Sequence, residues 1–156
     1  MKEKSMNKVE LKDNESVFDL ERKGYKIIQS KNTFMFGIDS VLLAHFAKHK
    51  KTDKVIDLGC GTGVIPILME ARYEGKDYTG IDIIPESVDM ATRSVELNKL
   101  DKKIKIEECD LKTYYKKCDK KFDVVTTNPP YMIVSENSKN EKITSKNKNK
   151  KGAFPM

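Results

Sequence analysis

The stretch that decides the fold is Lys54-Val-Ile-Asp-Leu-Gly-Cys-Gly-Thr-Gly63. Its first half is dominated by Val, Ile and Leu, which predicts a buried strand over residues 54–58. Three glycines at every second position follow and predict a tight turn. The apolar run from Val64 to about Tyr73 then predicts a helix. A strand, a glycine turn and a helix in this order form the first half of a βαβ unit.

The same alternation continues along the chain. A second strand is expected over 78–82, and Pro85, a residue suited to the first turn of a helix, opens a helix that runs to about Asn98. Further strands are expected over 104–108 and 122–127. Because crossovers between parallel strands are right-handed, this order predicts an α/β, Rossmann-like fold. We expect a parallel sheet with helices on both faces and a binding crevice at the carboxyl ends of the strands.

The two ends of the chain lack a clear hydrophobic period. Residues 1 to about 20 are polar and predict an arm or a short hairpin with residues 24–28. After Val134 a Lys/Asn-rich run begins, which cannot bury enough apolar surface to offset its ordering entropy. The expected organisation is one folded domain over 1–134 and a disordered tail over 135–156.

An amphipathic helix is expected ahead of the first sheet strand. Asp39 or Ser40 is its predicted N-cap, because a short polar side chain can accept a hydrogen bond from the first turn. We expect His45 to be a core histidine on its apolar face, and His49, which stands among lysines, to be solvated. The apolar face repeats with a period of 3.6 residues and consists of Val41, Leu42, His45 and Phe46.

Length and composition exclude several classes of protein. The chain has 156 residues, enough for one domain, and no apolar run approaches the roughly 20 residues that cross a bilayer. The amino terminus is charged and has no apolar signal region, so a cytoplasmic protein without membrane contact is expected. Three widely spaced cysteines and two isolated histidines predict neither disulfides nor a metal site. Most of the net charge of +6 lies in the tail, so charge alone does not identify a nucleic-acid partner.

The glycine turn carries the first indication of chemistry. Gly59, Gly61 and Gly63 permit left-handed backbone and let a ligand approach the main chain closely. The N–H groups of the following helix attract an anionic group such as a carboxylate. A dinucleotide fingerprint requires a glycine at position 64, where Val64 stands, so the loop reads GxGxG and not GxGxxG. The alternative is a glycine-rich connector that binds nothing.

Two aspartates stand at the ends of later strands. Asp82 ends the second strand, where a carboxylate can accept hydrogen bonds from both hydroxyls of a ribose. This position predicts a nucleoside cofactor without saying which one, and an ordinary strand-end aspartate is the alternative. Asp110 follows the third strand and either contacts the exocyclic amine of an adenine or caps a short helix near Leu111.

The tetrapeptide Asn128-Pro-Pro-Tyr131 follows the fourth strand directly, on the sheet edge that carries the glycine turn. Together with Asp57–Gly63 and Asp82 it resembles the class I S-adenosylmethionine-dependent methyltransferases that modify a planar exocyclic nitrogen on adenine or a glutamine amide. The resemblance implies S-adenosylmethionine as the cofactor, with no metal. It implies that the catalytic residues are Asn128, Pro129, Pro130 and Tyr131.

The chemistry explains these residue types. The lone pair of an exocyclic amine is delocalised into the ring, which makes the nitrogen a poor nucleophile. The Asn128 side-chain oxygen and the Pro129 carbonyl would each accept an N–H from it and aim its lone pair at the methyl group. Pro129 and Pro130 fix φ and remove competing donors, and Tyr131 would stack on the base. No general base is required, so catalysis rests mainly on proximity and alignment.

The segment over residues 27–47 resembles the amino-terminal motif of the bacterial tRNA (adenine-N6)-methyltransferases that modify the adenine beside the anticodon of a valine tRNA. This resemblance implies a tRNA partner. It also implies that Phe36, Gly37 and Asp39 or Ser40 contact the methionine moiety of the cofactor, as do residues 59–63. The implied cofactor-binding residues are Phe36, Gly37, Asp39, Ser40, Asp57, Gly59, Gly61, Gly63, Asp82 and Asp110.

The family fold continues for about three more strands, which this sequence does not offer. We therefore expect a fold truncated after the fourth strand and self-association through the exposed sheet edge. Two alternatives remain for function. A glutamine methyltransferase acting on protein release factors would share Asn128–Tyr131, although that family carries a helical substrate domain ahead of the fold. A non-catalytic module that binds cofactor or RNA is the second alternative.

Overall fold

The computed structural model describes residues 9–32 and 35–129. Pro130, Tyr131 and the predicted tail over 135–156 lie outside the described residues. The helices and strands follow in the order β1 (Glu15–Asp19), β2 (Lys26–Ser30), α1 (Ile38–Phe46), β3 (Lys54–Leu58), α2 (Val64–Tyr73), β4 (Asp77–Asp82), α3 (Pro85–Leu97), β5 (Ile104–Glu108), α4 (Leu111–Tyr114) and β6 (Val124–Thr127).

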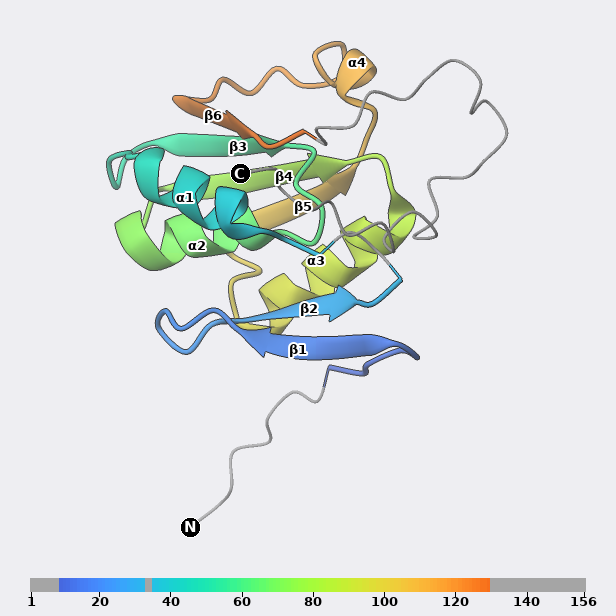
Figure 1. Ribbon diagram of the computed structural model, residues 1–156. Helices are drawn as coiled ribbons and strands as arrows, with labels where there is room; N and C mark the ends of the chain where they lie inside the picture. The colour runs from blue at the N-terminus through green and yellow to red at the C-terminus, as the bar shows by residue number, and fades with distance from the viewer. Residues whose placement is uncertain (1–8, 33–34, 130–156) are drawn as a thin grey trace, which may run out of the picture.

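Four strands form the central sheet in the order β5-β4-β3-β6, and all neighbours are parallel. The helices α2 and α3 pack on one face of this sheet, and α1 packs beside α2 (Figure 1). The strand and helix bounds over 54–108 agree with the prediction to within about one residue. The Rossmann-like α/β fold predicted from the alternation is confirmed. The carboxyl ends of β3, β4 and β6 meet at one edge of the sheet.

The strands β1 and β2 form a separate antiparallel hairpin, in which Val17 faces Ile28. The hairpin lies on the far side of α3 from the sheet, so α3 is covered on both sides (Figure 1). Ile27 and Ile28 are fully buried there. Of the two expectations for the amino-terminal region, the hairpin is therefore correct.

The core lies between the helices and the sheet, and Tyr78 of β4 is its largest buried side chain. The Tyr78 hydroxyl accepts the Gly75 N–H at 2.7 Å and lies 2.8 Å from Nε2 of His49. Nδ1 of His49 lies 3.2 Å from the Ala47 carbonyl oxygen. His49 is therefore hydrogen-bonded at both ring nitrogens, and the expectation that it is solvated was wrong. The lysines beside it in sequence stay exposed, whereas the His49 ring points inward.

Helix α1 differs from its predicted orientation. Its N-cap is Gly37 in extended conformation, and Asp39 and Ser40 lie inside the first turn instead of capping it. Its buried residues are Ser40 and Ala44, whereas Phe46 is 72% exposed and His45 is also exposed. Of the predicted apolar stripe only Val41 packs against the core, whereas Leu42, His45 and Phe46 are exposed, so the prediction of a core histidine was wrong. The small buried side chains Ser40 and Ala44 let α1 approach α2 closely, and Leu42 and Phe46 lie on the exposed side of the helix.

The second face of the sheet carries α4 and the turn that follows it. Thr79 alternates with Tyr78 along β4 and therefore points to this second face. Within the described ranges, β6 pairs on one side only, and its Val125 is 58% exposed. No helix in the described part of the chain is long and apolar enough to cross a membrane.

Candidate active site

The glycine loop between β3 and α2 has the left-handed backbone that its sequence predicts. Gly59 and Gly61 have φ values of 72° and 54°, a conformation that side chains with a Cβ rarely adopt. Apart from each glycine and its two chain neighbours, no heavy atom of the described residues lies within 4 Å of the position that a Cβ would occupy there. The loop therefore leaves open space against its own backbone, as a loop that cradles a ligand must.

The end of β4 holds this loop in place. The Gly59 and Cys60 N–H groups both donate to the Ile81 carbonyl oxygen at 2.9 Å. Gly61 N–H donates to Oδ2 of Asp82 at 2.8 Å. The loop and the carboxylate predicted to bind a ribose are thus parts of one hydrogen-bonded unit.

Asp82 has a fixed orientation at this edge. Its Oδ1 accepts the N–H of Ile84 at 2.9 Å while Oδ2 accepts that of Gly61, and the residue is 9% exposed. A carboxylate offers about four lone-pair positions, so each oxygen retains capacity for a second donor. Two vicinal hydroxyls are donors with the matching spacing. The structure is thus compatible with the predicted contact to a ribose.

Asp57 lies under the loop at the end of β3 and is 1% exposed. Its Oδ1 accepts a 2.7 Å hydrogen bond from Thr126 Oγ1 on β6, and its Oδ2 has no partner in the described part of the chain. Burial, and secondarily the nearby charge of Asp82, raise the pKa of Asp57 to about 7. An unsatisfied buried carboxyl oxygen beside an open glycine loop suits a ligand that brings an N–H donor or a positive charge.

Cys60 is a packing residue of the loop and is 5% exposed. Its Sγ lies against Gly80 of β4, where an added Cβ would come within 2.9 Å of the sulfur. Burial raises the pKa of the Cys60 thiol far above its ordinary value, so the group stays protonated. The sulfur therefore fills space between β3 and β4 and is not a nucleophile.

Of the two roles that the sequence allows for Asp110, the structure shows the helix cap. Its Oδ1 accepts the Lys112 N–H at 2.8 Å at the start of α4. The neighbouring Cys109 N–H donates to the Asp82 carbonyl oxygen at 2.9 Å. The segment after β5 thus lies beside the ribose-binding candidate, and a role of Asp110 in binding adenine stays a prediction.

The segment before α1 reaches the same edge through Ser40. Ser40 is 5% exposed, and its Oγ accepts a 3.0 Å hydrogen bond from Nδ2 of Asn128. Phe36 packs against the core, whereas Gly37 and Asp39 are exposed. Of the predicted cofactor contacts in this segment, Ser40 is the one whose side chain meets another predicted site residue.

Asn128 emerges next to the glycine loop because β6 is in register with β3. Leu58 is paired with Thr127, whose Oγ1 donates to the Leu58 carbonyl oxygen at 2.9 Å. The residues that follow, Gly59 on one strand and Asn128 on the other, therefore leave the sheet side by side. The predicted proximity of the glycine loop and the first half of the tetrapeptide is present in the structure.

A contact between Gln29 and Thr62 supports the loop and was not predicted. Gln29 lies at the end of β2, is 1% exposed, and donates from Nε2 to Thr62 Oγ1 at 3.3 Å. Its strand is held over α3 by Ser94, whose Oγ accepts the Ile28 N–H. A buried glutamine in a short strand has no periodic signal, because its partner lies in another element 33 residues away.

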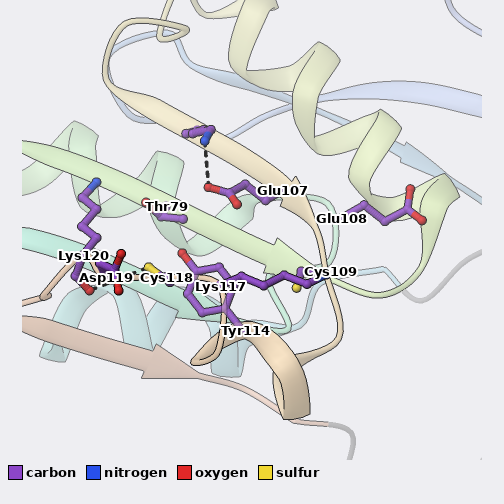
Figure 2. A pocket seen from close by; sticks show the side chains of 10 residues that line it. Thr79, Glu107, Glu108, Cys109, Tyr114, Lys117, Cys118, Asp119 and Lys120 are labelled. Carbon is purple, nitrogen blue, oxygen red and sulfur yellow. Dashed lines mark hydrogen bonds and ion pairs between the residues drawn. The ribbon is translucent and has the colours of Figure 1, made fainter.

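A cavity of about 390 Å³ opens on the second face of the sheet, between β5 and the segment after α4 (Figure 2). Thr79 forms part of its wall, and Lys105 and Glu107 form an ion pair of 3.0 Å there. None of the predicted site residues lines this cavity. The candidate active site is instead the strand-end edge around Gly59, Asp82 and Asn128.

The fold and this edge define a class. A parallel sheet in the order β5-β4-β3-β6, with an open glycine loop after the inner strand β3 and a buried carboxylate at the end of β4, is a Rossmann-like domain suited to a nucleoside cofactor. The chain belongs to the family described as "Methyltransferase small domain", whose model matches residues 27–147.

The curated relatives include methyltransferases of two kinds of substrate, a ribosomal protein and a tRNA. Over 57 residues the chain is 37% identical to the ribosomal protein L11 methyltransferase of Thermotoga neapolitana, covering 36% of this chain and 21% of the relative. Over 72 residues it is 28% identical to the tRNA1(Val) (adenine(37)-N6)-methyltransferase of a Flavobacteriaceae bacterium (strain 3519-10), covering 46% and 31%. The chain thus spans about a third or less of these relatives.

Solved structures share the fold at low identity. The tRNA m1G37 methyltransferase of M. jannaschii superposes with a TM-score of 0.56 at 23% identity, covering 75% of this chain and 36% of that chain. TrmK of M. capricolum, in complex with S-adenosyl-homocysteine, gives a TM-score of 0.50 at 18% identity, covering 60% and 41%. These similarities concern the fold.

S-adenosylmethionine is the cofactor of this family of methyltransferases, and the residues present fit it. The open space at Gly59 and Gly61 leaves room for its methionine moiety. The unpartnered Oδ2 of Asp57 suits a cationic or N–H-bearing group, and Asp82 retains acceptor capacity for the ribose hydroxyls. Among the residues described, no group of three His, Cys, Asp or Glu side chains is placed to hold a metal ion.

Proposed function

We propose that this chain carries the catalytic domain of a tRNA (adenine-N6)-methyltransferase. One observation carries the proposal: Asn128, the first residue of the predicted catalytic tetrapeptide, leaves β6 directly beside the glycine loop of β3. A polar amide held at this edge is suited to accept a hydrogen bond from an amine that faces the cofactor. The 28% identity to a tRNA adenine methyltransferase supports the choice of substrate.

When bound, S-adenosylmethionine supplies an electrophilic methyl group. The Asn128 side-chain oxygen and the Pro129 carbonyl each accept an N–H from the exocyclic amine, which turns its lone pair out of the ring plane toward this methyl group. Residues 59–63 and Asp82 would hold this cofactor so that its methyl group could pass to the nitrogen, with the electron pair of the carbon–sulfur bond remaining on sulfur. The methylated nitrogen then releases a proton to water.

An adenine in a loop suits this site better than one in a duplex. A base inside a stem must be flipped out at a cost of a few kcal/mol, whereas a base in an anticodon loop is already accessible. Tyr131, which lies outside the described residues, is the predicted stacking surface. These arguments favour tRNA over double-stranded DNA.

A protein substrate is the second candidate, because several relatives are ribosomal protein L11 methyltransferases. A glutamine amide, the alternative from the sequence, presents the same planar nitrogen as adenine. All three substrates would use the same glycine loop and the same Asp82. The cofactor site therefore does not distinguish between them, and the acceptor must be identified directly.

The test uses the full chain with methyl-labelled S-adenosylmethionine, offered bulk tRNA in one reaction and ribosomal protein L11 in another. We expect label in the tRNA, recovered as N6-methyladenosine after digestion. An Asn128→Ala variant serves as the control for background transfer. Label in the protein fraction alone would contradict a tRNA substrate, and equal transfer by Asn128→Ala would contradict the assigned role of Asn128.

A further inference from the structure

The side chains of Ser40 and Asn128 meet across 88 residues of sequence. Nδ2 of Asn128 donates to Oγ of Ser40 at 3.0 Å. The serine is 5% exposed, and Asn128 is partly buried. This contact joins the first turn of α1 to the first residue after β6.

Ser40 lies on the face of α1 that is held against α2. Ala44 follows it by four residues on the same face of α1 and is fully buried, which holds the helix against α2. At the other end of α1, the Tyr73 hydroxyl of α2 donates to the His45 carbonyl oxygen at 2.5 Å. The hydroxyl of Ser40 is therefore a fixed group against which a neighbouring side chain can be oriented.

The orientation of the Asn128 amide decides what it presents to a substrate. The terminal torsion of an asparagine is broad and roughly two-fold, so the oxygen and nitrogen can exchange places. With Nδ2 on Ser40, covalent geometry directs Oδ1 away from Ser40. In the opposite orientation Nδ2 would present its own N–H to the substrate amine, and two donors would face each other.

We propose that Ser40 is a positioning residue: its hydroxyl accepts from Nδ2 and so holds the Asn128 side chain with Oδ1 directed away from Ser40, where it accepts the substrate amine. This inference rests on the proposed function, because it assumes that Asn128 contacts the amine. It also gives Ser40 a different role from the cofactor contact that the resemblance implied. A cofactor ligand would change the affinity for S-adenosylmethionine, whereas a positioning residue would change the rate of transfer.

The first measurement does not need catalysis. In the ¹⁵N-labelled full chain, the side-chain amide signal of Asn128 is assigned by its loss in Asn128→Asp. We expect its Nδ2 protons to exchange with water about fivefold to tenfold faster in Ser40→Ala, the scale of one lost hydrogen bond. Ser40→Thr, which keeps the hydroxyl, should restore slow exchange. Equal exchange rates in Ser40→Ala and the parent would overturn the proposal.

The second measurement separates rate from affinity. In Ser40→Ala we expect kcat for tRNA methylation to fall about tenfold, with the Kd for S-adenosylmethionine changed by less than about twofold because the cofactor site is intact. Ser40→Thr should recover most of the rate. A loss of cofactor affinity that accounts for the whole effect would overturn the positioning role in favour of a cofactor contact.

Thr92→Ala is the control. Thr92 is an exposed residue on α3 whose Oγ1 donates to the Val88 carbonyl oxygen at 2.8 Å, away from the candidate active site. Its loss should leave both kcat and the Kd for S-adenosylmethionine unchanged. A chain that methylates no tRNA would contradict the proposed substrate, and the exchange measurement would still decide whether Ser40 orients Asn128.

Discussion

Thr126 Oγ1 on β6 donates a 2.7 Å hydrogen bond to Oδ1 of Asp57 on β3, and Oδ2 of the same carboxyl has no partner among the described residues. The hydrogen bond favours the charged carboxylate, but burial outweighs it, with a smaller contribution in the same direction from Asp82. Burial thus raises the pKa of Asp57 to about 7. The Asp57 carboxyl, beside the glycine loop, is therefore half protonated near neutral pH.

This raised pKa predicts how stability depends on pH. Between the ordinary pKa of 3.8 and about 7 the folded chain holds a proton that the unfolded chain has released. The contribution of Asp57 to the free energy of unfolding is therefore greatest below this window and decreases as the pH rises through it, by roughly 4 kcal/mol in total. Asp57→Asn should remove this component, so that the variant gains stability relative to the parent as the pH rises.

Urea denaturation of both proteins at pH 5 and pH 8 measures the effect. The difference between the two chains isolates Asp57 from the other carboxylates, whose contributions are common to both. A stability difference that is the same at both pH values would show that Asp57 titrates at its ordinary pKa.

Asp82→Ala should weaken S-adenosylmethionine binding by about 1.5 to 3 kcal/mol, the scale of a lost charge-assisted hydrogen bond. The variant loses the predicted ribose acceptor and also releases the Gly61 N–H that donates to this carboxylate. Titration calorimetry gives the affinity directly. Asp101→Ala, an exposed aspartate in the turn before β5, is the control and should bind like the parent. Unchanged affinity in Asp82→Ala would remove Asp82 from the site.

Arg93 anchors the hairpin to α3 and should contribute to stability. Its guanidinium donates to both carboxylate oxygens of Glu15, at 2.8 and 2.6 Å, and the two side chains are only 14% and 6% exposed. Arg93→Met leaves the Glu15 charge buried without this partner. We expect a loss of about 3 to 5 kcal/mol in the free energy of unfolding.

A double-mutant cycle with Glu15→Gln identifies the cause of that loss. If the unpaired carboxylate is responsible, the double variant should recover part of the stability lost in Arg93→Met. Additive losses would mean that the two side chains act independently.

The edge of β6 provides a prediction about association. Val125 is 58% exposed on a strand that pairs only with β3 in the described ranges. If copies of the chain pair through this edge, Val125→Lys should shift the sedimentation distribution toward the monomer, because a charged edge disfavours strand pairing. A monodisperse monomer for the parent chain would contradict self-association.

Local sequence determined the βαβ part of this protein. The strand at 54–58, the turn at Gly59–Gly63 and the helix after it follow from hydrophobic period and glycine placement, and the structure reproduces them. The same is true of the strand-end position of Asp82. These features depend on residues within a few positions of one another, and short-range sterics and periodicity act over that distance.

Only the tertiary structure decided which side chains meet. The sequence predicted that α1 buries Phe46 and His45, but the helix buries Ser40 and Ala44 instead, because the direction in which it packs against α2 is not encoded in its own hydrophobic pattern. The contacts of Ser40 with Asn128 and of Gln29 with Thr62 join elements that are distant in sequence. No local period encodes such contacts, because they depend on the crossing of helices and the order of strands, which are set by packing of the whole core.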